Sequence, residues 1–404
     1  MEEAVQPTAS FIFVYIHINF IVILCDFSAV YGILYINQRK RGIVMKKINP
    51  YTPMTEYLAG RDEVIQEGKD SIYSLMHGYP RQPIIYYGLR GVGKTVLLTA
   101  LREYAIKEGV LTFHFEIQEK VSLINDIILS AKNSLQSFTL TYTTGENSIS
   151  VEMNKKLSEM MLQSNLVELL LNLGRLAKES KNTIIYFIDE IQYAKQNELE
   201  ALITAQHRIN QERLPITIIA AGLPKILVNM TESKTYAERM FAFVEISSLE
   251  YKDAENAIVN PGKPFDITYT EKALKEIYKI TEGYPYFIQQ FCHLISKKYK
   301  EIDLNIVNEM KSVFFKELDK SFFKVRFDKC TPKEKEFMFA MVSCRELPCT
   351  VANVAHIMNK ELKSISPIRA RLINKGLIYA TRHGEIDFTV PKFDEFLKRI
   401  NLEK

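Results

Sequence analysis

Apolar runs, and one stretch in which apolar and polar residues alternate, are interspersed with segments of helical periodicity between residues 58 and 246. Strands are predicted at Pro83–Tyr87, Val110–Ile117, Ile184–Ile188, Ile216–Gly222 and Ala242–Ile246. Helices are predicted between them, at 58–76, 96–107, 121–137, 151–180 with a bend near Gly174, and 198–213; 139–150 is expected to be a loop. Strands that alternate with helices indicate an α/β fold with a parallel sheet, which binds its ligand at the carboxyl ends of the strands.

The next segment is helical throughout. Helices are predicted at Tyr251–Asn260, at Glu271–Lys300 and at Leu304–Phe327. Pro261–Pro264 is expected to break the chain, and Gly283-Tyr284-Pro285 to mark a kink or a helix start, because proline lacks an N–H for a helix interior. We interpret these helices as a small lid beside the sheet.

The last 74 residues follow a third pattern. Three predicted helices (332–342, 350–358 and 363–375) precede two β-like stretches (376–380 and 385–389) separated by a turn, which is the plan of a winged helix. Candidate DNA contacts lie on the third helix and at the tip of the wing: Ser364, Ser366, Arg369, Arg371, Arg382 and His383. Residues 331–404 hold 13 Lys and Arg against 9 Asp and Glu, which suits phosphate contacts. Winged helices also bind proteins, so double-stranded DNA and a protein partner both stay open.

The segment Gly88-Leu89-Arg90-Gly91-Val92-Gly93-Lys94-Thr95 carries the clearest chemistry. It fits the pattern G-x-x-x-x-G-K-[ST] between a predicted strand and a predicted helix that opens with Val96. Glycines let such a loop turn its N–H groups toward a triphosphate. Lys94 is expected to reach the β- and γ-phosphates, and the Thr95 hydroxyl to bind Mg²⁺. The sequence therefore predicts a nucleoside triphosphate site.

Two adjacent acids end the most apolar strand. Asp189 is predicted to hold the Mg²⁺ and Glu190 to activate the attacking water, which favours hydrolysis over binding alone. The strand 216–222 stands where a polar sensor is expected, yet it ends in Ala-Ala-Gly, and Thr217 lies early in it. A standard sensor role is therefore doubtful.

Two arginines are weaker candidates. Arg61 precedes a predicted helix and either contacts the nucleotide or is a solvated charge. Arg239 either acts as an arginine finger, if a neighbouring subunit or domain brings it to a γ-phosphate, or forms a salt bridge at a helix end.

Composition adds few constraints. The chain has 404 residues, a net charge of +4 and five cysteines without metal-ligand spacing, which suits a reducing cytoplasm. Phe11–Ile36 is apolar enough to span a bilayer and precedes a basic cluster, but His17, Asn19 and Asp26 interrupt it. Because Met45-Lys46-Lys47 resembles a bacterial start, residues 1–45 are interpreted either as a mis-started extension or as a membrane or targeting segment.

With these motifs together, the chain resembles the AAA+-like P-loop ATPases of the STAND and origin-recognition or archaeal-ATPase type. The resemblance spans residues 49 to the C-terminus, in segments 49–53, 58–63, 88–95, 189–192, 221–224, 236–239, 283–287, 375–379 and 382–385. It implies ATP rather than GTP, and it implies that Arg61 and the Gly283–Pro285 segment border the base and the sugar. The expected domains are the apolar extension (1–45), a P-loop ATPase core (46–250), a helical lid (251–329) and a winged helix (330–404).

Three functions are compatible with this reading. The first is a cytoplasmic ATPase switch, in which the lid and the winged helix report the bound nucleotide to DNA or a protein. The second is an oligomeric DNA-loading or mobile-element helper ATPase, with ATP-dependent self-association and Arg239 acting in trans. The third is a regulatory ATPase tethered to a membrane by Phe11–Ile36.

Overall fold

The computed structural model describes residues 49–52, 58–118, 122–130, 166–234, 237–382 and 384–402. The apolar segment 11–36, the expected loop at 139–150, the first part of the predicted helix 151–180 and His383 lie outside these ranges. Residues 123–130 are helical, as predicted for part of 121–137. No helix within the described ranges is long and apolar enough to cross a membrane.

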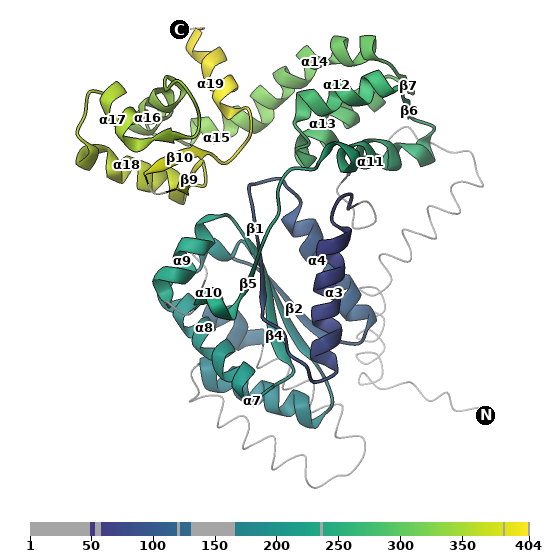
Figure 1. Cartoon of the computed structure of the whole chain (residues 1–404), viewed down its shortest axis with the longest axis vertical. Helices are drawn as coiled ribbons and strands as arrows, with labels where there is room; N and C mark the ends of the chain where they lie inside the picture. Colours follow the sequence, from purple (N-terminus) through teal and green to yellow (C-terminus); the bar gives the residue numbers. More distant parts are fainter. Residues whose placement is uncertain are drawn as a thin grey trace, which may run out of the picture. The chain divides into compact units, whose positions relative to one another are not determined.

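A five-stranded parallel sheet forms the centre of the first half (Figure 1). Its strands are β1 (Ile84–Tyr87), β2 (Leu111–Glu116), β3 (Ile184–Asp189), β4 (Ile216–Gly222) and β5 (Ala242–Glu245), in the order β2-β3-β4-β1-β5. Ile84 pairs with Ile219 of β4 on one side and Ala242 of β5 on the other. The α/β fold with a parallel sheet is thus confirmed.

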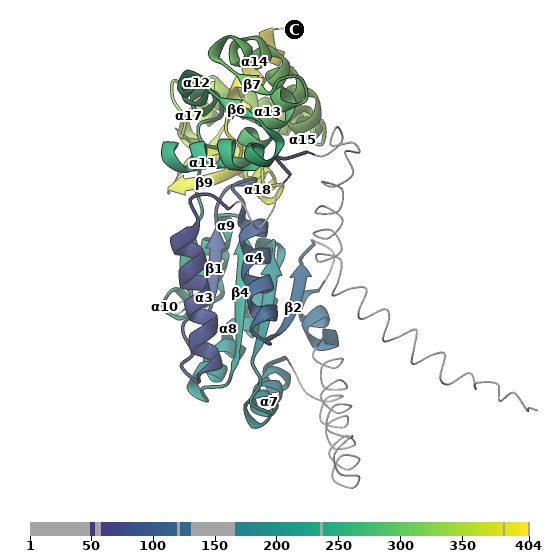
Figure 2. The ribbon, with the colours of Figure 1, turned by 90° about the vertical axis from the view of Figure 1, so that its right-hand side faces the viewer.

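Helices cover both faces of this sheet (Figures 1 and 2). Every residue of β3 and β4 is buried, and β3 alternates in its packing. Ile185 and Phe187 pack in the cluster that holds helices α3 (Asp62–Met76) and α4 (Lys94–Lys107). The intervening β3 residues pack with α7 (Leu166–Glu179) and α8 (Gln196–Gln211). Two covered faces explain why the strands are continuously apolar.

The predicted bend at Gly174 is wrong. Helix α7 runs through this glycine without a break. A Cβ at position 174 would lie 2.9 Å from side-chain atoms of Ile216 and Leu214. Gly174 therefore permits the close packing of an unbroken helix against Leu214 and Ile216.

The helical segment after the sheet begins with α11 (Tyr251–Gly262), which includes Pro261 and ends at Gly262, within the break expected at 261–264. It is followed by the 3₁₀ turn η4 (Lys263–Phe265), α12 (Glu271–Thr281), α13 (Pro285–Ser296) and α14 (Leu304–Leu318), and the short strands β6 (Thr268–Tyr269) and β7 (Glu301–Ile302) pair in parallel. Pro285 occupies the first position of α13, and Gly283 has φ +67°. Of the two predicted alternatives for Gly-x-Pro, a kink or a helix start, the structure shows the helix start.

A π-helical turn, η5 (Asp319–Phe323), joins α14 to α15 (Lys324–Asp328). Then come α16 (Pro332–Val342), β8 (Cys349–Thr350), α17 (Val351–Ile357), α18 (Leu362–Asn374), β9 (Ile378–Arg382), β10 (Glu385–Phe388) and α19 (Phe393–Leu402), with the antiparallel strand order β8-β10-β9. Helix α19 was not predicted. It closes an aromatic cluster in which the Phe323 ring lies 5.7 and 5.4 Å from those of Phe393 and Phe396.

Candidate nucleotide site

The glycine-rich loop at 88–95 lies between the carboxyl end of β1 and the start of α4. Gly91 and Gly93 have φ of +81° and +99°, a region that other residues rarely adopt. A Cβ at position 88 would lie 2.1 Å from the carbonyl oxygen of Ile246, so this glycine is needed for a close backbone approach. The loop has the backbone freedom and the helix N-terminus that phosphate binding requires.

Lys94, the first residue of α4, points back into the loop. Its ammonium donates to the carbonyl oxygens of Gly88 (2.9 Å) and Leu89 (2.7 Å), and the residue is 8 % exposed. Burial lowers the pKa of Lys94 to about 8, against the opposing effect of the Glu190 and Asp189 carboxylates. A buried ammonium held by neutral carbonyls can exchange these partners for phosphate oxygens at little cost.

Thr95 and Asp189, the two residues expected to bind Mg²⁺, are in contact. The Thr95 hydroxyl donates to Oδ2 of Asp189 at 2.7 Å, although 94 positions separate the two residues. Oδ1 of Asp189 accepts the backbone N–H of Glu190 at 2.8 Å, which orients the carboxylate. A hydroxyl beside a carboxylate, at the tip of a strand, is an oxygen donor pair that suits Mg²⁺. These residues fit the ion that the motif implies.

Glu190 follows at the turn into the 3₁₀ helix η3 (Ile191–Tyr193), with a left-handed φ of 54°. Its carboxylate Oε2 accepts a hydrogen bond from the side-chain amide of Gln192. The oxygen of the same amide accepts the backbone N–H of Leu223, just after β4, at 2.9 Å. Gln192 thus brings a polar side chain to the carboxyl end of β4, a contact that sequence analysis missed.

Arg90, in the loop, lies next to Glu190 and Tyr193. Its guanidinium donates to the hydroxyl of Tyr193 at 2.8 Å and lies 4.0 Å from Oε1 of Glu190. These residues line a cleft into which the C-terminal part of the chain contributes Arg326, Lys329 and the 374–377 segment. The glycine-rich loop at 88–95 (the phosphate loop) and the chain from α15 onward (the C-terminal part) therefore line the same cleft.

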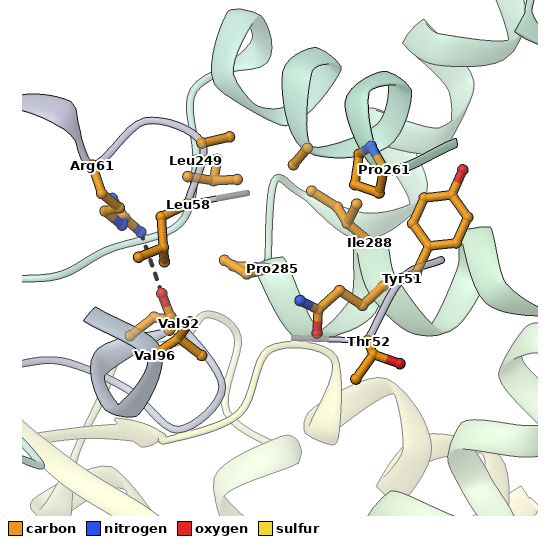
Figure 3. A pocket seen from close by; sticks show the side chains of 14 residues that line it. Tyr51, Thr52, Leu58, Arg61, Val92, Val96, Leu249, Pro261, Pro285 and Ile288 are labelled. Carbon is orange, nitrogen blue, oxygen red and sulfur yellow. Dashed lines mark hydrogen bonds between the residues drawn. The ribbon is translucent and has the colours of Figure 1, made fainter. Parts of the chain in front are cut away.

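Arg61 and Pro285 line a second pocket, on the inner side of the loop (Figure 3). The Arg61 guanidinium donates to the carbonyl oxygen of Val92 at 3.4 Å and also to that of Ser247. Burial lowers the pKa of Arg61, with Asp253 opposing. The other lining residues come from the segment before α3, from the loop and from helices α4, α11 and α13. They include Tyr51, Leu58, Val96, Pro261 and Ile288. The lining is largely apolar, as a purine base requires.

Residues 57–219 match the family model described as AAA ATPase domain, and this span contains the loop, Thr95, Asp189 and Glu190. These residues are an AAA ATPase domain. Residues 320–397 match a second model, described as Domain of unknown function (DUF8462). None of the curated proteins is similar enough to the chain to count as a match.

Solved structures resemble the chain at low identity. The Walker-type ATPase paby2304 of Pyrococcus abyssi aligns with a TM-score of 0.56 and 13 % identity over 86 % of this chain and 98 % of its own. The RuvB Holliday junction branch migration motor of Thermotoga maritima gives 0.46 and 15 % over 87 % and 99 %. The ORC1 protein of Aeropyrum pernix, solved in complex with DNA, gives 0.46 and 12 % over 85 % and 93 %. The first of these shares the fold.

The other candidates lie outside the phosphate loop of the AAA ATPase domain. Arg239 is exposed in helix α10 (Ala237–Met240), and its carbonyl oxygen accepts from Gln82. Both residues precede strands, at the amino end of the sheet, whereas the loop follows the carboxyl end. The structure therefore does not bring Arg239 to the site of its own chain.

The residues predicted to contact DNA differ in how far their polar groups are already bonded or buried. The Ser364 and Ser366 hydroxyls bond to carbonyl oxygens within their own helix or its cap. Arg371 forms an ion pair with Glu334 at 3.4 Å, and Nε of Arg369 is buried. Arg382 has a side chain that is 83 % exposed. Of these cations, Arg382 is the most accessible to a partner.

Proposed function

We propose that this protein hydrolyses Mg-ATP at the phosphate loop and uses the bound nucleotide to control the docking of its C-terminal part. Lys94 and the loop N–H groups would hold the phosphates, and Thr95 and Asp189 the Mg²⁺, which neutralises phosphate charge when bound. Glu190 would orient and deprotonate the attacking water. The apolar pocket beside Arg61 and Pro285 would accept the adenine and ribose.

One observation carries this proposal most directly. The Thr95 hydroxyl and the Asp189 carboxylate are in contact, and the neighbouring Glu190 points its carboxylate to the same cleft as Arg90. The arrangement separates a metal-binding acid from a second acid, which Gln192 and Arg90 orient and which would act as the base. A protein that only binds nucleotide has no need of the second acid.

The docking part of the proposal rests on contacts at the end of α18. Nζ of Lys225, just after β4, lies 2.6 Å from Oδ1 of Asn374. A Cβ at Gly376 would lie 3.0 Å from the Arg90 guanidinium and 3.1 Å from Leu223. A change in the position of Arg90 or of the β4 end would therefore alter this contact.

We propose that the C-terminal part is a winged helix with duplex DNA as its partner; the order of three helices and an antiparallel sheet supports this. Lys363 in the first turn of α18 is exposed, as is Arg382 at the β9–β10 turn. Lys363 lies on the third helix and Arg382 lies at the wing, the two elements that winged helices use to contact DNA. A protein partner is the alternative that the experiment below distinguishes.

The test is steady-state ATP hydrolysis by the full chain with Mg²⁺, with and without duplex DNA. We expect hydrolysis that DNA stimulates and that Glu190→Gln abolishes while nucleotide binding persists. Lys94→Ala should weaken binding itself. Normal turnover by Glu190→Gln would overturn the assignment of the base. Turnover that is indifferent to DNA, together with no DNA binding, would leave the ATPase intact and reject DNA as the partner.

A further inference from the structure

Helix α13 begins in direct contact with the phosphate loop. A helix leaves the N–H groups of its first turn without partners inside the helix. In α13 the preceding residue, Tyr284, supplies no side-chain cap, and the N–H of Tyr286 donates to the carbonyl oxygen of Gly91 at 3.3 Å. A Cβ at position 91 would lie 3.0 Å from the Cβ of Tyr286. A carbonyl group of the phosphate loop therefore caps α13.

The ring of Tyr286 extends this contact to the π-helical turn η5. It stacks on the ring of Phe322, with the ring centres 4.5 Å apart and the planes at 23°. The Arg326 guanidinium lies 3.8 Å from the centre of the Phe322 ring and donates to the Phe322 carbonyl oxygen at 2.7 Å. Stacked rings and guanidinium groups on rings attract each other. Phe322 is thus held both by α13 and by α15.

The same turn also holds helix α19. Phe323, the residue after Phe322, stacks on Phe396 with the ring centres 5.4 Å apart. Asp319, the first residue of η5, accepts two hydrogen bonds from the Arg399 guanidinium, at 2.6 and 3.0 Å. Two consecutive phenylalanines therefore contact different elements, one the start of α13 and the other α19. Single π-helical turns within helices are frequent at functional sites.

We propose that η5 transmits nucleotide binding at the phosphate loop to the C-terminal part. This inference rests on the proposed function and names the element through which docking would be controlled. The Gly91 carbonyl and the Val92 N–H belong to one planar peptide unit and point in opposite directions. When the Val92 N–H donates to a phosphate, the Gly91 carbonyl oxygen stays directed at Tyr286, and the stack of Tyr286 on Phe322 holds η5 in place. In an empty loop this peptide unit can turn, which loosens the stack and the docked C-terminal part.

The experiment measures backbone hydrogen exchange at residues 374–377, which line the cleft that the C-terminal part shares with the loop. The full chain is compared without nucleotide and with a saturating non-hydrolysable Mg-ATP analogue, whose binding is checked by calorimetry. Coupling between two sites is typically about 5–150-fold, so we expect the analogue to slow exchange at least about fivefold in the wild type. In Phe322→Leu, which removes the ring but stays apolar, the effect should fall below about twofold, because the coupling is lost.

Three further variants separate coupling from packing. Tyr286→Leu removes the same stack from the side of α13 and should also lose the response. Tyr286→Phe keeps both rings and should respond as the wild type does. Phe291→Leu is the matched control, because Phe291 is fully buried in α13 and its ring lies 4.7 Å from that of Phe314 in α14. This variant should lose stability and keep the response.

The outcomes distinguish this inference from the proposed function. If the wild type binds the analogue and its exchange does not change, the docking part of the proposed function is overturned. If the wild type responds and Phe322→Leu or Tyr286→Leu responds equally, only the inference is overturned. An equal loss of response in Phe291→Leu would also overturn it, because the response would then follow general stability. Loss of analogue binding in Phe322→Leu would assign the stack to nucleotide binding itself and reject the coupling role.

Discussion

The Gln192 side chain links Glu190 to the carboxyl end of β4, the strand between β3 and β1. Its amide nitrogen donates to Glu190, and its amide oxygen accepts the N–H of Leu223 at 2.9 Å. Gln192 is only 5 % exposed, so these two bonds are its means of satisfying a buried amide. Gln192 therefore connects the proposed catalytic base, Glu190, to the backbone just after β4.

Replacing Gln192 by Leu should slow ATP hydrolysis without weakening nucleotide binding. The variant keeps the volume of the side chain but leaves Glu190 free to rotate, and loss of such an orienting partner typically costs about 10–100-fold. We expect kcat to fall by that factor and KM to change less than about twofold, with Gln192→Asn in between. Gln196→Leu, on the exposed start of α8, is the matched control. A rise in KM at unchanged kcat would show that Gln192 serves binding instead.

The parts of the site that could be predicted are those set by local spacing. A strand, a loop of fixed length and a helix place Lys94 and Thr95, and a strand tip places Asp189, whatever the rest of the chain does. The contact of Gln192 with Leu223 depends on the order of the strands in the sheet. The cleft lined by Arg90 and Arg326 depends on α15 packing near the loop. Such long-range contacts leave no periodic signal in the sequence.

The fold shows the same division. The central strands β3 and β4 were predictable because both faces of the sheet are covered there, so their residues are almost all apolar, whereas β2 was predictable from its alternation of apolar and polar residues. The bend at Gly174 was wrongly predicted because glycine in a helix indicates either weakness or close packing, and only the neighbouring Ile216 decides between them. Helix α19 was missed although Phe393 and Phe396 are three residues apart, since a ten-residue helix offers few periodic positions.

Arg61→Ala should weaken ADP and a non-hydrolysable ATP analogue equally. Arg61 lines the proposed base pocket and bonds to the carbonyl oxygens of Val92 and Ser247, so we propose that it acts on the base and ribose, which the two nucleotides share. We expect both dissociation constants, measured by calorimetry with Mg²⁺, to rise about tenfold, because a bond from a charged donor is lost on the pocket wall. Arg81→Ala, an exposed arginine before β1, should change neither. Selective loss of the analogue would place Arg61 at the phosphates instead.

Gly174→Ala should destabilise the protein although alanine is the better helix former. Helix propensity favours alanine by about 1 kcal/mol. Against this, the added methyl would lie 2.9 Å from Ile216 and Leu214, and overpacking a tight interface costs about 1–3 kcal/mol. We expect a net loss of about 1 kcal/mol in urea-induced unfolding. Adding Leu214→Ala should recover part of this loss relative to Leu214→Ala alone, because the two positions are in contact. A more stable Gly174→Ala protein would show that α7 shifts freely.

Glu334 should make the stability of the C-terminal part depend on acid pH. Its carboxylate is fully buried and accepts from the Thr331 N–H at 2.8 Å and from Lys375 at 2.7 Å. Burial alone would raise the pKa of Glu334, but the Lys375 ammonium and the Thr331 N–H outweigh it and lower the pKa below the usual 4.5. The unfolded chain then binds the proton more tightly, so the stabilisation is complete above about pH 4.5 and is lost as pH falls through the lowered folded value.

Glu334→Gln tests this linkage, since it removes the charge and keeps the shape. Because the side chains of Lys375 and Arg371 are 36 % and 50 % exposed and can be hydrated, we expect a loss of only about 1–2 kcal/mol in urea-induced unfolding at pH 7. The gap between the wild type and the variant should narrow as pH falls below 4.5, because the wild-type carboxylate becomes protonated as well. Glu336→Gln, which breaks the more exposed pair with Lys360, should cost less than about 0.5 kcal/mol. A gap that stays constant down to pH 3 would mean that the carboxylate contributes through packing rather than through charge.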